Sequence, residues 1–251
     1  MRIGLKLFTT NNAQIPLAKE LYTEGFFDFI ELYVIPNTHA GTIHDWKQLD
    51  IPFVIHAPHS IHGFNLAQSE KWASNGGTFR EVRMVADSLS ATIIIVHGGN
   101  NGSLDETIRQ LRLLDDSRII LENKPLIGIH GETCVGCTPA EMNKVAEAGA
   151  LNGIALDFGH ALCTANTLEI DVFRLIEGLA AFTPKIYHLS DGNAGSKTDT
   201  HYNLGKGDFL ITKFLSFVPR NALLTLETPR DTTMGLDQFV EDVQYLRGIA
   251  S

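Results

Sequence analysis

Eight short runs of apolar and β-branched residues recur along the chain, and each is followed by a stretch with a helical pattern. Several of these runs are continuously apolar rather than alternating, which is typical of parallel strands that are buried on both faces. We therefore predict strands over residues 3–8, 29–34, 53–56, 92–96, 118–122, 153–158, 185–189 and 223–227.

The stretches between the strands carry helix signals. Ser103 and Thr138 each precede a glutamate by three residues, Glu106 and Glu141, which is the pattern of a capping box. Pro139 also stands at the first position of the second helix, where its missing N–H is tolerated. Longer helical patterns predict helices over residues 70–88, 168–181, 209–217 and 236–249, and the irregular segment 36–50 predicts a short helix around 44–49.

The alternation of eight strands with helices and short connections indicates a parallel (β/α)8 barrel. The main alternative is a doubly wound open sheet, which usually carries a glycine-rich phosphate turn after its first strand. Here the first strand is followed by Thr9-Thr10-Asn11-Asn12 instead. No linker, low-complexity segment or charge block interrupts the pattern. We therefore predict an α/β fold with one domain, a single (β/α)8 TIM barrel over residues 1–251.

The composition is that of an ordinary globular protein, with 44% hydrophobic and 20% charged residues in a chain of 251. The N-terminus opens directly into a strand pattern, and no apolar run approaches the ~18 residues that span a bilayer. We therefore expect a cytoplasmic protein. The three cysteines, Cys134, Cys137 and Cys163, do not make a disulfide framework, and we expect reduced thiols.

The net charge of −9 argues against a broad basic surface for nucleic acid. It does not exclude an anionic substrate, because bound divalent ions would offset much of this charge. A metal cluster would also supply local positive potential for a phosphate group without any lysine.

Imidazoles and carboxylates recur where the predicted strands end. In a parallel barrel these ends converge on one mouth, and carboxylates beside apolar strands are costly unless they are paired or bound to a metal. Residues two apart in an extended segment point to the same side, so Asp199 and His201 can bind one ion together. Imidazole and carboxylate are the usual ligands of zinc, manganese and iron. The strand ends that carry such side chains are His56 to His59, His97, Glu122, Asp157 to His160, His188 with Asp199 and His201, and Glu227.

The same residues carry a family resemblance that covers nearly the whole chain. The matching motifs are Pro58-His59 followed by Asn65-Leu66, His97-Gly98-Gly99, Glu122-Asn123, Asp157 with His160, His188 with Asp191, the series Asp199, His201, Leu204, Gly205 and Gly207, and finally Glu227. This series resembles the endonuclease IV (AP endonuclease family 2) branch of the xylose-isomerase-like TIM barrel superfamily.

The resemblance implies up to three metal ions, usually zinc, with manganese as a possible substitute. It implies three ligand sets, the first two bridged by Glu122: His59, His97 and Glu122; Glu122, Asp157, His188 and Glu227; and His160, Asp199 and His201. The implied activity is phosphodiester hydrolysis, with damaged DNA cleaved at abasic sites as the first candidate and Glu122, Asp157 and Glu227 as the catalytic carboxylates. Clustered divalent ions suit this reaction because they lower the pKa of bound water and clamp the ester oxygens. We expect Asn123 and Asp191 either to orient ligands or to cap loops.

Two alternatives stay open. A sugar isomerase or epimerase of the same superfamily needs one ion, typically manganese, and two glutamates that move a proton next to the sugar carbonyl. Its ligands would be Glu122, Asp157, His188 and Glu227. A non-catalytic protein would bind metal without turnover. The family's DNA readers place an aromatic and an apolar wedge where this chain has His62 and Gly63, so the multinuclear site is better supported than the DNA substrate.

Overall fold

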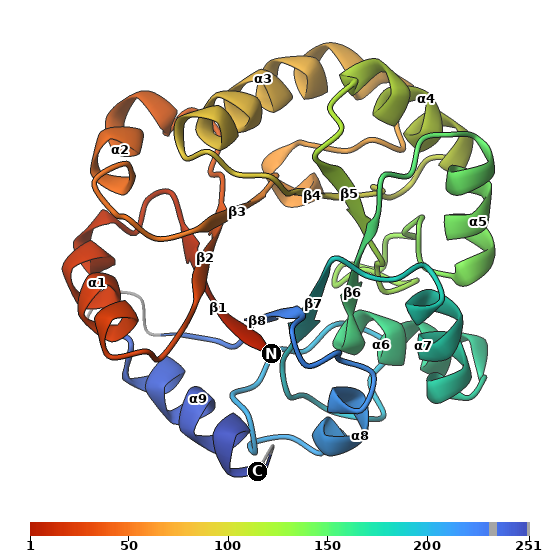
Figure 1. Ribbon diagram of the computed structural model, residues 1–251. Coiled ribbons are helices and arrows are strands. Elements are labelled where there is room, and N and C mark those ends of the chain that lie inside the picture. Colours follow the sequence, from red (N-terminus) through yellow and green to blue (C-terminus); the bar gives the residue numbers. More distant parts are fainter. Residues whose placement is uncertain (231–234, 250–251) are drawn as a thin grey trace.

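Eight parallel strands close into a barrel in sequence order, and β1 pairs with β8 to complete it. The computed structural model in which they are seen describes residues 1–230 and 235–249. Figure 1 shows the strands surrounding a central axis. They are β1 (Arg2–Phe8), β2 (Phe29–Tyr33), β3 (Phe53–His56), β4 (Ile94–His97), β5 (Ile119–Glu122), β6 (Ile154–Asp157), β7 (Ile186–Leu189) and β8 (Leu223–Leu226). The predicted (β/α)8 barrel is confirmed, and every predicted strand overlaps an observed one.

Helices form an outer ring around the strands (Figure 1). They are α1 (Ile15–Thr23), α2 (His39–Trp46), α3 (Trp72–Ser88), α4 (Leu104–Leu114), α5 (Pro139–Glu147), α6 (Phe158–Leu168), α7 (Val172–Ala180), α8 (Ile211–Leu215) and α9 (Asp237–Ile249). Short 3-10 turns lie at η1 (Asn12–Gln14), η2 (Ser60–His62) and η3 (Ser69–Lys71). Within residues 1–230 and 235–249, no helix combines the length and the apolar character needed to cross a bilayer.

One of the two predicted capping boxes forms completely. The Thr138 side chain accepts a hydrogen bond from the backbone of Glu141, and the Glu141 carboxylate accepts one from the backbone of Thr138. At Ser103 only half of the box forms, because its side chain caps the backbone of Glu106 while the Glu106 carboxylate binds Arg109. The prediction of a second complete box was therefore wrong, because a nearby guanidinium competes for the carboxylate.

The predicted helix over residues 168–181 was wrong in its first part. Two helices occupy this region: α6 ends at Leu168, and Glu169 takes a left-handed conformation with φ 56° before α7 begins. The start of α6 was also missed. Asp157 ends β6 and at the same time caps α6, since its Oδ1 accepts a hydrogen bond from His160 N at 2.6 Å. A residue that ends a strand and begins a helix leaves no separate loop signal in the sequence.

The interior of the barrel is built in layers. Six buried side chains form an apolar layer across it: Phe29, Val54, Ile95, Ile120, Ala155 and Ile186. Because side chains alternate along a strand, the residue two positions later on each strand also points inward. These second residues form a polar layer: Glu31, His56, His97, Glu122, Asp157 and His188, all buried. The apolar layer therefore supports the polar layer at the C-terminal ends of the strands.

The outward faces of the strands pack against the helices. Leu5, Ile30 and Leu121 belong to this larger core. Gly4 lies inside the barrel, where an added Cβ would come within 2.3 Å of the Phe29 ring. Glycine at this position leaves room for the bulkiest side chain of the apolar layer, which helps to close the bottom of the site.

Candidate metal centre

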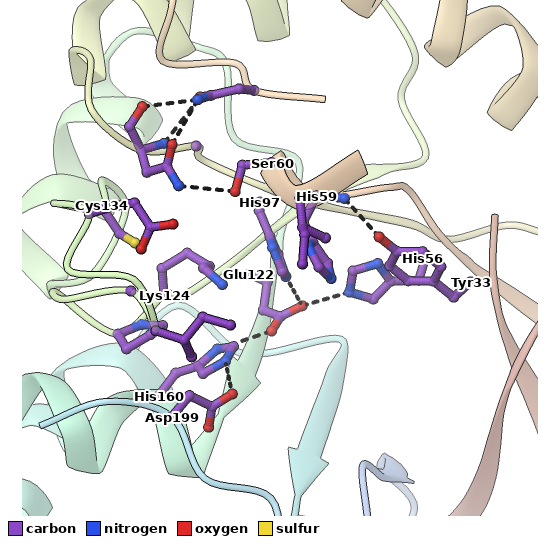
Figure 2. A pocket seen from close by; sticks show the side chains of 18 of the residues that line it. Tyr33, His56, His59, Ser60, His97, Glu122, Lys124, Cys134, His160 and Asp199 are labelled. Carbon is purple, nitrogen blue, oxygen red and sulfur yellow. Dashed lines mark hydrogen bonds and ion pairs between the residues drawn. The ribbon is translucent and has the colours of Figure 1, made fainter. Parts of the chain in front are cut away.

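Three residues of the polar layer, His56, His97 and Glu122, line a cavity of about 750 Å³. Figure 2 shows side chains of several strands pointing toward one another around Glu122. The candidate ligands that line the cavity are His59, His97, Glu122, His160, Asp199, His201 and Glu227. The two others, Asp157 and His188, are buried beside them, with 2% and 0% of their surface exposed.

Glu122 is the centre of the polar layer and is surrounded by four imidazoles. Its Oε2 lies 3.0 Å from His56 Nε2 and 3.1 Å from His97 Nε2. Its Oε1 lies 3.1 Å from His160 Nδ1 and 3.6 Å from His188 Nδ1. Burial disfavours the charged carboxylate, but His97 and His188 outweigh that effect and hold the pKa of Glu122 well below its usual range. A carboxylate so placed is suited to bridging two cations.

A second group of contacts joins His188 to two carboxylates. His188 Nε2 lies 2.9 Å from Glu31 Oε2, and His188 Nδ1 lies 3.0 Å from Glu227 Oε1. Lys6 joins the same two carboxylates, since its Nζ is 3.2 Å from Glu31 Oε1 and also pairs with Glu227. Thr225 donates a further hydrogen bond to Glu31 at 2.7 Å. The imidazole and the ammonium thus hold both carboxylates from opposite sides.

Glu31 and Lys6 were missed from the sequence, although each interrupts an apolar strand with a charge. Burial opposes ionisation of Glu31, but His188 and Lys6 lower its pKa to about 2. Burial also disfavours the charged ammonium, yet Glu227 and Glu31 raise the pKa of Lys6 above its ordinary value. Both groups are therefore charged at neutral pH, and the expectation that the site needs no lysine was incomplete.

Asp199 and His201 lie together, as their spacing predicts. Asp199 Oδ2 is 2.6 Å from His201 Nε2 and 3.3 Å from His160 Nε2. His201 Nδ1 lies 2.5 Å from the backbone oxygen of Glu227, which leaves Nε2 facing the carboxylate. Despite burial, Asp199 raises the pKa of His201 to about 9. These three side chains form one ligand set, and His160 Nδ1 joins it to Glu122 Oε1 at 3.1 Å.

Asn123 ties the ends of β5 and β6 together. Its Nδ2 donates to the Asp157 backbone oxygen at 2.9 Å, and its Oδ1 accepts from the Asp157 backbone nitrogen at 2.8 Å. Its backbone oxygen lies 2.8 Å from His160 Nδ1. Asn123 therefore orients two candidate ligands, which was one of its two expected roles.

Asp191 caps a loop rather than contacting a ligand. Its carboxylate accepts hydrogen bonds from four backbone N–H groups, those of Gly192, Gly205, Gly207 and Phe209. A Cβ at Gly207 would lie 2.5 Å from Asp191 Oδ1, so glycine permits this close approach. The capped loop is the one that carries Asp199 and His201.

His59 lies beside the group around Glu122. Its ring stacks on His97 with centroids 5.3 Å apart, and it meets Tyr33 edge-on at 5.2 Å. His56, which sequence reasoning did not select, contacts Glu122 instead. The same period of two that marks the polar layer would have indicated His56, because it follows Val54 on β3.

The segment after His59 has no large apolar side chain at the wedge positions. His62 Nδ1 lies 2.7 Å from the Tyr33 hydroxyl, and Gly63 takes a left-handed conformation with φ 84°. Phe64 is buried in the core. Ile61 is 62% exposed and lines the cavity, so it is the apolar side chain that this segment offers to a ligand.

The donor set fits divalent metal ions. Among the described residues, His97 Nδ1 and Asp199 Oδ1 are buried ligand atoms of this site that lack a hydrogen-bond partner. Buried polar atoms are normally satisfied, so such atoms mark a place for an ion or ligand. Four groups of described residues have ligand atoms within 4.8 Å of one another: His56, His97 and Glu122; Glu122, Asp157 and His188; Glu31, His188 and Glu227; and His160, Asp199 and His201.

The cysteines take no part in these groups. All three thiols are free, as expected, and all three are buried. Burial raises the pKa of Cys163 to about 12, which keeps that thiol protonated.

Comparisons with known proteins agree with this picture. No protein-family model matches the chain. A curated protein from Thermoplasma volcanium, described as a probable endonuclease 4, is 26% identical over 206 residues, which cover 75% of this chain and 71% of that protein. The sequence similarity to endonuclease IV that the motifs indicate is therefore confirmed.

Solved structures share the fold over the whole chain. A D-tagatose 3-epimerase-like protein superimposes with a TM-score of 0.74 at 19% identity, covering 100% of this chain and 97% of that one. Endonuclease IV from Thermus thermophilus superimposes with a TM-score of 0.72 at 20% identity, covering 100% and 99%. At these identities the likeness concerns the fold, and it includes both an endonuclease and an epimerase-like protein.

Proposed function

We propose that this protein is a metal-dependent phosphodiester hydrolase similar to endonuclease IV, with DNA containing an abasic site as the first substrate to test. The observation that carries the proposal is the ligand set of His160, Asp199 and His201, which lies beside the groups around Glu122. An isomerase that uses one ion has no need of Asp199 and His201 as ligands. Sequence similarity to a probable endonuclease 4 supports the same choice.

The proposed ligands are the nine residues expected from the sequence. Up to three ions, zinc or manganese, would be held by His59, His97, Glu122, Asp157, His160, His188, Asp199, His201 and Glu227. His59 is preferred to His56 because the family resemblance places the ligand at the Pro58-His59 motif. Within the described part of the chain, the ring of His59 has no hydrogen bond and borders the cavity.

When bound, such ions lower the pKa of water and neutralise charge on the phosphate. The carboxylates of Glu122, Asp157 and Glu227 would bring the negative charge that binds the ions. Nearby cationic groups hold the pKa of Glu122 and of Glu227 well below the usual range, whereas burial raises the pKa of Asp157 until an ion binds beside it. Glu31 accepts a hydrogen bond from His188 Nε2, so that the second ring nitrogen, Nδ1, is left for an ion.

Glu122→Gln and Glu227→Gln test the proposal, because each change keeps the size of the side chain and removes its charge. We expect more than one equivalent of metal in the purified protein and cleavage of an abasic oligonucleotide. Each variant should lose turnover while its circular dichroism spectrum is retained. Unaltered kinetics in either variant, or a metal content of one or none by elemental analysis, would refute the assigned roles.

The variants His59→Ala and His56→Ala test which of the two histidines is a metal ligand. His59→Ala should remove about one equivalent of metal, because it removes a proposed ligand. His56→Ala should retain the metal content, since His56 would act only by supporting Glu122. Elemental analysis of the two variants gives the answer, and the reverse pattern would assign the ligand role to His56.

A sugar isomerase or epimerase remains the second candidate. Glu122, Asp157 and His188 form one compact ligand group with Glu227 beside it, which is enough for a single ion. A cavity of about 750 Å³ is also of the size that holds small molecules. This alternative predicts one equivalent of manganese, epimerisation of a ketose, and full activity after His201→Ala. Tight metal binding without turnover of either substrate would favour the non-catalytic alternative.

A further inference from the structure

The side chain of Lys124 lines the cavity, two positions after Glu122 in the chain. The two residues are two positions apart in an extended segment, so their side chains point to the same side. Pro125 restricts Lys124 to an extended conformation. The backbone of Lys124 is held on both sides, because its nitrogen donates to Gly136 O at 3.1 Å and its oxygen accepts from Thr164 Oγ1 at 3.0 Å. Figure 2 shows the side chain lying beside Glu122.

The ammonium of Lys124 has no carboxylate partner within residues 1–230 and 235–249, although it is half-buried. Lys6 differs in this respect, because it pairs with Glu31 and Glu227. Arg230 also lines the cavity, but it donates to backbone oxygens. Lys124 is therefore a positive charge that the surrounding protein leaves available.

Lys124 borders the same cavity as His59, His97 and Glu122. A fixed cation beside imidazoles that would bind metal cations is unfavourable unless an anion binds between them.

We propose that Lys124 binds a phosphate oxygen of the substrate and selects a phosphate ester over a neutral sugar. This inference rests on the proposed function and adds a protein-derived contact to those supplied by the ions. A phosphate group satisfies the ammonium through charge-assisted hydrogen bonds, whereas a sugar hydroxyl leaves its charge uncompensated. Lys124 acts as a binding residue, and no proton transfer is assigned to it.

Titration calorimetry with inorganic phosphate tests this role, using both the metal-loaded and the chelator-treated full chain. Lys124→Met removes the charge while keeping the length of the side chain, and we expect it to weaken phosphate binding by about 10- to 100-fold. Lys124→Arg keeps the charge and should retain most of the affinity. Lys144→Met, on the exposed face of α5, removes a lysine outside the cavity and should leave phosphate binding unchanged.

Equal phosphate affinity in Lys124→Met and the unaltered protein, in the metal-loaded form, would overturn the inference, because the ions alone would then hold the phosphate. An equal loss in Lys144→Met would also overturn it, since the effect would then be one of net charge. If Lys124→Met folds poorly, Lys124→Gln provides a polar, neutral replacement. Binding is read without turnover, so a protein that binds phosphate through Lys124 but cleaves no diester would contradict only the proposed function.

Discussion

Glu31 has no place in the proposed ligand set, yet it fixes which nitrogen of His188 faces the proposed metal site. Its carboxylate is fully buried and accepts from His188 Nε2 and Thr225 Oγ1, while Lys6 supplies a compensating charge. A histidine that donates one N–H to a carboxylate presents its other nitrogen as a more basic ligand. The same logic holds for His201, whose Nδ1 contacts a backbone oxygen. The orientation of the imidazoles is thus set by residues behind them.

Glu31→Gln should therefore weaken metal binding while leaving the barrel folded. An amide keeps the shape of the carboxylate but removes the charge that holds the His188 N–H and Lys6. We expect a loss of metal affinity of about 10- to 100-fold, measured by competition with a coloured chelator. Glu24→Gln, at an exposed position after α1, is the matched control. Unchanged affinity in Glu31→Gln would show that His188 keeps its orientation without this partner.

At the scale of elements, the site depends on how loops are held to the ends of strands. The loop that follows β7 contributes Asp199 and His201, and its path is held by the four backbone hydrogen bonds to Asp191. Strand β6 passes directly into α6 through Asp157, which fixes His160 on the first turn of that helix. Short connections of this kind give the ligand set little freedom before an ion binds.

Asp191→Asn should release the loop after β7. Asparagine keeps one accepting oxygen and turns a donor toward backbone N–H groups, so buried donors would lose their partners. We expect a destabilisation of about 1–3 kcal/mol in urea unfolding and loss of about one metal equivalent. Asp50→Asn, an exposed position, should change neither quantity. A variant that is destabilised but keeps its full metal content would separate loop capping from metal binding.

At the scale of the whole molecule, buried carboxylates gather at one end of the barrel, and protonated imidazoles of the same site balance their charge. Burial opposes protonation, but neighbouring carboxylates raise the pKa of His160 and His188 well above the ordinary value, and that of His201 to about 9. Without ions, protons on these imidazoles offset the charge of Glu122, Asp199 and Glu227. Metal ions and protons therefore compete for the same positions.

Removal of metal should lower the stability of the protein, and the loss should depend on pH. A protonated histidine whose pKa is raised on folding stabilises the metal-free fold. For His201 this stabilisation is complete below the unfolded pKa of 6.5 and is lost as the pH rises through the folded pKa of about 9. We expect the difference in Tm between loaded and chelator-treated protein to widen from pH 6.5 to pH 9. Thermal unfolding at several pH values measures it, and a difference that is constant or narrows would contradict this balance of charges.

The sequence by itself determined the barrel and the inward direction of most ligands. Apolar runs of strand length followed by His, Asp or Glu are local patterns, and alternation along a strand places residues such as Val96 and His97 on opposite faces regardless of the rest of the chain. Asp199 and His201 were paired correctly for the same reason. Local patterns also identified the chain's resemblance to endonuclease IV.

Only the tertiary structure decided which side chains meet. The contact of Glu31 with His188 joins residues 157 positions apart, and it exists because β1, β2, β7 and β8 come together when the barrel closes. The same closure brings Lys6 to Glu227, His56 rather than His59 to Glu122, and leaves Lys124 without a carboxylate among the described residues. The direction of a side chain is a property of its own strand, whereas its partner depends on strand register and barrel closure, which no local pattern records.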